Sequence, residues 1–119
     1  MRIRTRIWIE DAEGSVLYGL GRHRILQTIR ELGSIQAASK ALGISYRGLW
    51  GRLRLSERRL GFALVDSRPG RGEQAGTRLT ERGQKLLDGY EAAVHEIYDA
   101  SERAYEEHVR SRLTPHAAD

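Results

Sequence analysis

The sequence predicts a mainly α-helical fold with small β-hairpins and one long C-terminal helix. Segments with helical apolar spacing follow one another between residues 21 and 60, and glycines separate them. A glycine-rich loop then lies between two short β-type segments within residues 63–79. The stretch from Thr80 to Arg112 contains no proline. This order of elements suits one small domain followed by a projecting helix.

The composition is that of a small and heavily charged protein. The chain has 119 residues, of which 30% are charged and 39% hydrophobic. It has no cysteine, which excludes disulfides and thiolate metal sites. We find no leader sequence and no long apolar stretch, so we expect a cytoplasmic protein without membrane contact. The four histidines lack metal-ligand spacing and no catalytic triad pattern is evident, so we expect no metal, no cofactor and no enzyme activity.

Basic charge is concentrated in the middle of the chain. Residues 45–78 hold eight arginines and three acidic residues, whereas residues 80–112 hold five basic and eight acidic residues. Clustered positive charge is typical of proteins that bind a polyanion such as double-stranded DNA. The alternative is a solvated charged face without a partner.

The N-terminal residues predict a β-hairpin. Arginines alternate with Ile3, Ile7 and Ile9 over residues 2–9, a period of two that is typical of a half-buried strand. Residues 11–15 form the expected turn, and residues 16–18 form the returning strand. Glycines at positions 19 and 21 end it.

Three helices are expected after the hairpin. The first runs from about Gly21 to Leu32 and has one apolar face; Gly33 ends it. Ser34 is a suitable N-cap for the second helix, which reaches a turn at residues 42–44. Ser45 is a suitable N-cap for the third, which extends to about residue 60. Two such helices are typical of a helix-turn-helix, in which the second helix enters the major groove. The alternative is an ordinary helical hairpin.

The third helix opens with side chains that suit DNA. Ser45, Tyr46 and Arg47 provide a hydroxyl, a phenol and a guanidinium, and Arg47 is the candidate for a bidentate contact to guanine. Two glycines on this helix, Gly48 and Gly51, each cost about 1 kcal/mol relative to alanine. They indicate the close approach of either a neighbouring helix or DNA, and the sequence leaves both open.

A wing is expected behind the helix-turn-helix. Residues 63–67 and 77–79 have strand character, and the basic, glycine-rich residues 68–76 join them. Wings place arginines against phosphates or in the minor groove. The alternatives are a flexible linker or a phosphate-binding loop, although the Gly-Lys-Ser/Thr end of a P-loop is missing. With the wing included, the predicted DNA-contacting residues are Ser34, Ser45, Tyr46, Arg47, Arg52, Arg54, Arg68, Arg71 and Arg78.

A long helix is expected from the N-cap Thr80 to about Arg112. Residues on it recur at steps of four and three, which is a heptad-like seam. A helix of this length extends beyond so small a domain, so we expect a second copy of the chain to cover the seam; the alternative is a helix that folds back on its own domain. The predicted dimerisation residues are Tyr90, Val94, Ile97, Ser101 and Ala104.

Several of these motifs together resemble one known family. The run Ala41-Leu42-Gly43-Ile44-Ser45-Tyr46-Arg47, followed by Trp50, is similar to the N-terminal DNA-binding domain of the molybdate-responsive ModE repressors. Further similar motifs are Gly33-Ser34-Ile35 with Ala37-Ala38, Ile7-Trp8-Ile9-Glu10, and the wing followed by Leu79-Thr80 and Gly83. The resemblance covers roughly residues 5–105, and a more distant one links the chain to the LysR-type regulators.

The resemblance implies a winged helix-turn-helix that forms a homodimer through its long helix and binds a palindromic operator. It implies that Ser45, Tyr46 and Arg47 begin the recognition helix, that Trp50 packs within or supports it, and that Arg68 and Arg71 belong to the wing. Full-length ModE proteins carry C-terminal molybdate-binding domains, which this chain lacks, so we expect no molybdate binding on it. Whether the chain is a short regulator or a piece of a longer one stays open.

The expected organisation is a winged helix-turn-helix domain over residues 1–79, a dimerisation helix over 80–112 and a disordered tail over 113–119. The expected function is that of a sequence-specific, DNA-binding bacterial transcriptional regulator, acting as a homodimer on an inverted repeat. Two alternatives remain, a protein-interaction module and a non-specific architectural DNA binder. Salt separates the first alternative from DNA binding, because binding through several arginines weakens steeply as salt rises.

Overall fold

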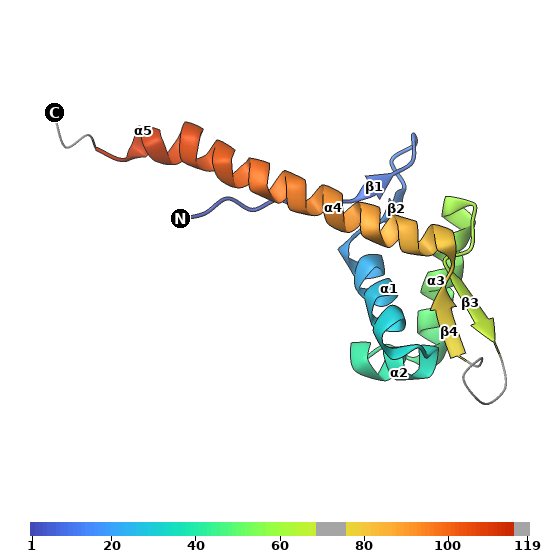
Figure 1. The fold of residues 1–119 in the computed structure, drawn as a ribbon. Helices are drawn as coiled ribbons and strands as arrows, with labels where there is room; N and C mark the ends of the chain where they lie inside the picture. The colour runs from blue at the N-terminus through green and yellow to red at the C-terminus, as the bar shows by residue number, and fades with distance from the viewer. Residues whose placement is uncertain (69–75, 116–119) are drawn as a thin grey trace.

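The computed structural model describes residues 1–68 and 76–115 of the chain (Figure 1). Helices dominate it, two small antiparallel hairpins accompany them, and one long helix projects from the domain. The fold is therefore the predicted winged helix-turn-helix with an N-terminal hairpin and a long C-terminal helix. No helix in this part of the chain has the length and apolar character needed to cross a membrane.

The helix-turn-helix consists of α2 (Ile35–Leu42) and α3 (Tyr46–Leu60), and α1 (Leu20–Leu32) packs on α2. Each of the three helices ends at a glycine with a positive φ, as expected where the chain must reverse. Ser34 Oγ accepts a hydrogen bond from Ala37 N at 3.1 Å, and Ser45 Oγ accepts one from Gly48 N at 3.0 Å. Both predicted N-caps are thus confirmed.

The wing is the hairpin of β3 (Val65–Arg68) and β4 (Gly76–Leu79), in which Ser67 lies opposite Thr77. Its second strand is held against the helices, because Thr77 N donates to the carbonyl of Gly33, the residue between α1 and α2, at 3.0 Å. Gly76 lies so close to the same carbonyl that an added Cβ would be 2.7 Å from it. The wing therefore has a fixed position relative to the helix-turn-helix.

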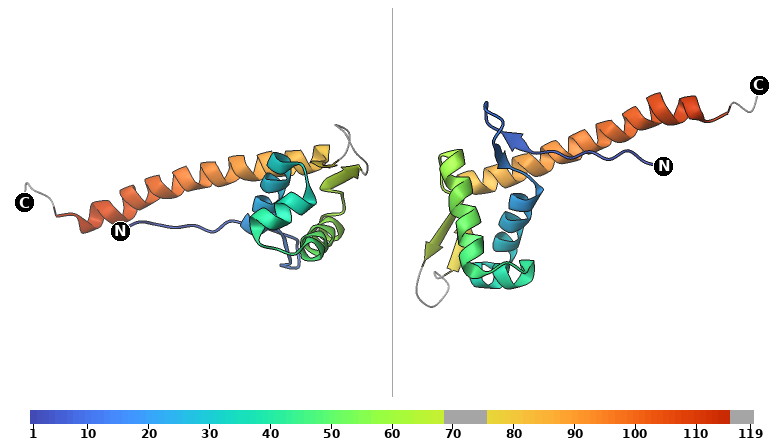
Figure 2. Two further views of the ribbon diagram at one scale, coloured as in Figure 1. Left: turned by 90° about the horizontal axis from the view of Figure 1, so that it is seen from below. Right: turned by 180° about the vertical axis from the view of Figure 1, so that it is seen from behind.

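The predicted strand over residues 2–9 is wrong for most of its length. Strand β1 contains only Ile9–Glu10, because its partner β2 (Val16–Tyr18) is three residues long and leaves the earlier residues unpaired. Residues 1–8 instead run alongside the long helix α4 (Glu81–Ala104), as all views agree (Figures 1 and 2). Tyr90 Oη donates to the carbonyl of Ile7 at 2.7 Å, and residues 2–5 share a cleft with Tyr98 and Glu102.

A buried aromatic group joins the N-terminal hairpin, α1 and α4. Tyr18 is fully buried, and the ring centroids of Tyr18 and Tyr90 are 5.0 Å apart in an edge-to-face arrangement. The His23 ring packs against both tyrosines, and its Nδ1 is 2.8 Å from Tyr18 Oη. Burial lowers the pKa of His23, and it raises the pKa of Tyr18. Leucines and isoleucines of α1, α2 and α3 continue the core, together with Leu64 and Val65 at the entry to the wing and Leu87 of α4.

The projecting helix begins at the predicted cap, since Thr80 Oγ1 accepts a hydrogen bond from Gly83 N at 2.9 Å. After Ala104 it continues through a π-helical turn, η1 (Tyr105–Arg110), into α5 (Ser111–Leu113), so it ends one residue beyond the predicted Arg112. Tyr105 is buried although it lies far out on this helix, and Met1 lines the same small cleft. Of the predicted tail, residues 116–119 lie outside the described residues.

Candidate DNA interface

The outer face of α3 carries a line of basic side chains. Arg47, Gly51, Arg54 and Arg58 are spaced by four, three and four residues, so they lie on one side of the helix. All four are exposed. Leu49 and Leu53, on the opposite side, are fully buried in the core. Helix α3 therefore presents arginine to solvent along its length while its apolar side fixes it on the domain.

The three predicted contact residues at the start of α3 lie at the front of this face. Tyr46 and Arg47 are exposed in its first turn, and Ser45 is exposed just before it. Because the oxygens of Ser34 and Ser45 already accept backbone hydrogen bonds as N-caps, their hydroxyl protons are the groups left to donate to an outside acceptor.

The two glycines of α3 have different surroundings. A Cβ on Gly48 would be 2.9 Å from Ser45 Oγ, so a larger residue there would have to shift the hydroxyl that caps the helix. A Cβ on Gly51 would meet nothing within 4 Å. Among the described residues, no neighbouring helix approaches Gly51, so of the two explanations that the sequence left open, helix packing does not account for this glycine.

Arg54 is exposed, but contacts with other side chains hold its guanidinium in place. Its guanidinium carbon lies 4.5 Å from the centroid of the Trp50 ring, and its Nη1 is 2.6 Å from Glu57 Oε1. The other carboxylate oxygen of the buried Glu57 accepts hydrogen bonds from Leu64 N at 2.7 Å and Val65 N at 3.3 Å. This chain of contacts joins the outer face of α3 to the first strand of the wing.

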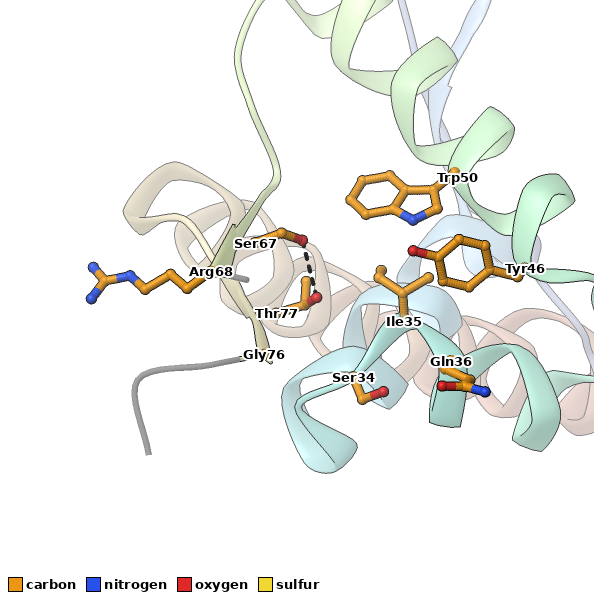
Figure 3. Close-up of a pocket in the computed structure, with 9 residues that line it drawn as sticks. All are labelled: Ser34, Ile35, Gln36, Tyr46, Trp50, Ser67, Arg68, Gly76 and Thr77. Atoms are coloured by element: carbon orange, nitrogen blue, oxygen red, sulfur yellow. Dashed lines mark hydrogen bonds between the residues drawn. The ribbon is translucent and has the colours of Figure 1, made fainter. Parts of the chain in front are cut away.

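A cleft of about 600 Å³ separates the wing from the first turns of α2 and α3 (Figure 3). Tyr46 and Trp50 line it on the α3 side, and Ser34 and Gln36 line it at the start of α2. On the wing side, Ser67 Oγ and Thr77 Oγ1 are 3.1 Å apart. The cleft is thus lined by hydroxyl, indole and amide groups around an apolar floor at Ile35.

Arg68 is one of the residues that line this cleft, and both described wing arginines, Arg68 and Arg78, are exposed. Figure 3 shows the Arg68 side chain directed away from it. Arg78 lies opposite Asp66 in the hairpin register, and both are exposed. Arg68 Nε is 3.8 Å from Asp66 Oδ2, a contact between two exposed side chains. The third predicted wing arginine, Arg71, lies outside the described residues.

The structure thus brings Ser34, Ser45, Tyr46 and Arg47 together at one end of the domain, with Arg54 and Arg68 on either side of the cleft. Arg52 lies on another side of α3, away from the line that begins at Arg47. Sequence reasoning missed that Gln36, Trp50 and Thr77 line the cleft. Gln36 could have been found, since a polar residue in the first turn of the first helix of a helix-turn-helix faces outward; Thr77 depends on the register of the wing.

The predicted dimerisation residues divide between the core and the surface. Tyr90 is 6% exposed and is committed to the aromatic group of its own chain. Val94 is half-buried against the core and Ser101 is half-buried, whereas Ile97 and Ala104 are exposed. Of the predicted residues, Ile97 therefore offers a large apolar side chain to a second copy, since it is 41% exposed.

In the part of the chain that the structure describes, no three histidine, cysteine, aspartate or glutamate side chains gather closely enough to hold a metal ion.

Known proteins with similar sequences include molybdenum-pterin-binding proteins and a molybdenum transport protein. Over 89 residues the chain is 32% identical to the molybdenum-pterin-binding protein MopB of Rhodobacter capsulatus, covering 72% of this chain and 33% of that protein. Over 105 residues it is 31% identical to the molybdenum transport protein ModE of Azotobacter vinelandii, covering 88% of this chain and 38% of that protein. The chain thus spans about a third of the length of these distant homologues.

The fold is also that of a solved DNA-binding domain. A crystal structure of the BenM DNA-binding domain with benA site 1 DNA matches 73% of this chain and 97% of that one, with a TM-score of 0.53 and 22% sequence identity. The family model of the bacterial regulatory helix-turn-helix proteins of the lysR family matches residues 20–84, from the first helix through the wing into α4. This is a family of regulators rather than enzymes, and the match includes every element that forms the candidate interface. The chain belongs to the lysR family of bacterial regulatory helix-turn-helix proteins.

Proposed function

We propose that this chain is the DNA-binding part of a transcriptional regulator and that it recognises a specific sequence in double-stranded DNA. The observation that carries the proposal is the outer face of α3, where Arg47, Arg54 and Arg58 are exposed around Gly51, whose added Cβ would meet no described residue within 4 Å. Base edges in the major groove accept hydrogen bonds from arginine, most often at guanine. The BenM domain of the same fold has been crystallised with DNA.

Each part of the interface has a separate role in this proposal. Arg47, at the start of α3, contacts a base. The cleft beside the wing receives a backbone phosphate, to which Tyr46 and Trp50 donate hydrogen bonds. The outward-facing Arg68 and Arg78 add contacts that do not depend on the base sequence, because phosphates carry no sequence information directly.

We further propose that the chain acts as a homodimer on an inverted repeat, with Ile97 and Ala104 of two copies in contact. Helix α4 extends beyond the domain, and its exposed apolar residues include Ile97, Tyr98 and Val109 of the adjoining π-helical turn. Two-fold symmetry in the protein requires two matching half-sites in the DNA.

The test is selection of bound sequences from a pool of random duplex DNA by the purified protein at near-physiological salt. The expected result is an inverted repeat, retained with an affinity that falls steeply as salt rises. Retention of DNA without any motif would make the chain a non-specific architectural binder. Failure to retain any DNA at low salt would overturn the proposal and favour a protein-interaction module.

A further inference from the structure

Three arginines gather at the corner where β2, α1 and α3 meet, on a different side of α3 from the wing. Arg22, in the first turn of α1, donates from Nε to Ser56 Oγ on α3 at 2.7 Å. Arg59 lies beside them, with Nη1 3.5 Å from the carbonyl of Val16 on β2. Arg22, Ser56 and Arg59 line one small surface cleft of this corner. Arg52 stands one turn before Ser56 on the same side of the helix.

These three charges lack a counter-charge among the described residues. None of the ion pairs there involves Arg22, Arg52 or Arg59. Burial lowers the pKa of the Arg22 guanidinium, and the positive charges of Arg52 and Arg59 lower it further. Like charges held together in a folded protein repel one another, and a bound anion relieves that repulsion.

The position of the three arginines on α3 indicates which anion fits. An α-helix turns by about 100° per residue, so Arg52 lies on roughly the opposite side of α3 from Trp50, which faces the wing. Arg59 is seven residues after Arg52 and lies on that same side. The line from Arg47 to Arg58 runs between these two flanks. A helix in the major groove has one phosphate backbone on each flank, because the groove is bounded by both strands.

We propose that Arg22, Arg52 and Arg59 form a second phosphate-binding site, which contacts the DNA strand opposite to the one that the wing contacts. The inference rests on the proposed DNA binding and adds a partner for a surface that the helix-turn-helix face and the wing leave unexplained. Ser56 holds Arg22 in place, so the site is partly organised before DNA arrives. The two flanking sites together would fix the rotation of α3 in the groove.

Salt dependence of DNA binding by the full chain tests the inference. The variant is Arg52→Gln with Arg59→Gln, since both side chains are exposed on α3. The matched control is Arg24→Gln with Arg103→Gln, two exposed arginines on α1 and α4 outside the corner, which removes the same charge. Arg52→Lys with Arg59→Lys retains the charge. Binding is measured on the selected sequence and on a random duplex, over salt concentrations of roughly 50–200 mM.

The expected result is that the glutamine pair lowers the slope of log affinity against log salt by about two on both duplexes, one for each lost phosphate contact. The lysine pair and the control pair should keep the slope of the unmodified protein. Circular dichroism checks folding, and should the pair not fold, Arg52→Gln alone carries the test with an expected loss of about one.

Two negative results have different meanings. If the unmodified protein binds DNA with a steep slope and the glutamine pair matches it, the second phosphate site is overturned and the proposed function stands. If the unmodified protein shows no salt-dependent DNA binding, the proposed function fails and this inference fails with it. If the corner binds an acidic protein instead of DNA, the glutamine pair should bind DNA with the same salt slope as the unmodified protein.

Discussion

Glu57 Oε2 lies 2.7 Å from the backbone nitrogen of Leu64, so a side chain of the third helix satisfies the backbone at the entry to the wing. The same carboxylate pairs with Arg54, which rests on Trp50. One buried acid thus fixes both the wing and part of the outer face of α3. Its carboxylate therefore connects the backbone at the entry to the wing with Arg54 on the outer face of α3.

Glu57→Ala is expected to destabilise the protein by about 1–3 kcal/mol, because the backbone N–H groups of Leu64 and Val65 lose their buried acceptor. Denaturant unfolding measures the change. The control is Glu81→Ala, which removes an exposed acid in the first turn of α4 that pairs with Lys85 across one helical turn and should cost less than about 1 kcal/mol. Equal losses for the two variants would show that the Glu57 contacts contribute nothing to stability.

Gly51→Ala is expected to change stability and DNA binding in opposite directions. Alanine in place of a helix-interior glycine stabilises a helix by about 1 kcal/mol, and none of the residues that the structure describes opposes an added Cβ at this position. The methyl group would hold the backbone of α3 away from the bases, so affinity for the selected DNA should fall.

Gly89→Ala is the matched control for Gly51→Ala, since Gly89 is also an exposed helical glycine with open space around it but lies on α4. Unfolding and DNA titration are measured on both variants. Gly89→Ala should gain similar stability and keep its affinity. If Gly51→Ala binds DNA as well as Gly89→Ala does, close approach of DNA at Gly51 is excluded.

Arg47→Ala is expected to weaken binding to the selected sequence by about 1–3 kcal/mol and to relax the preference at one base pair, while binding to random duplex falls less. The reason is that a base contact acts only on the correct sequence. Competition between the two duplexes measures it, and Arg24→Ala on α1 is the control. Equal losses on both duplexes would reassign Arg47 to a phosphate.

Stability should fall as the pH decreases below about 6.5, because burial lowers the pKa of His23 from that ordinary value. Between 6.5 and the lower pKa of the folded state, the unfolded chain binds more protons, so acid favours unfolding; above 6.5 the contribution is complete. Unfolding at pH 7.5 and pH 5.5 measures it. His23→Gln should show a smaller drop than the unmodified protein, whereas the exposed His95→Gln should not.

Ile97→Asp is expected to convert a dimer into a monomer, because it places a charge at the centre of the proposed contact on α4. Sedimentation equilibrium measures the mass. Ala92→Asp adds the same charge on the other side of the helix, at another exposed position, and should leave the dimer intact. A dimer that survives Ile97→Asp would require a different surface.

The helices of this fold could be predicted because their limits depend on nearby residues. Gly33 and Gly43 end helices, and Ser34, Ser45 and Thr80 begin them, all through contacts within a few positions of sequence. Apolar spacing then identified the buried side of α3. The same local signals predicted the wing.

The features that were missed depend on distant contacts. Nothing near Ile7 in sequence indicates that its carbonyl bonds Tyr90, so the N-terminal residues were predicted to form a strand. Tyr90 fits a heptad seam by spacing alone, yet its neighbours in space are Tyr18 and His23. Glu57 was unremarked for the same reason, since its partners in the wing are identified only by the folded chain.

Because Trp50 lines the cleft beside the wing, its fluorescence can report on that cleft. The chain has two tryptophans, and the other, Trp8, immediately precedes β1, and its Nε1 donates to Glu10 Oε1 at 2.7 Å. Replacing Trp8 with phenylalanine would leave one indole, in the cleft between wing and helices and under the Arg54 guanidinium. Its emission would then follow hydration of that cleft alone, so occupation of the interface could be timed in a stopped-flow instrument without any dye.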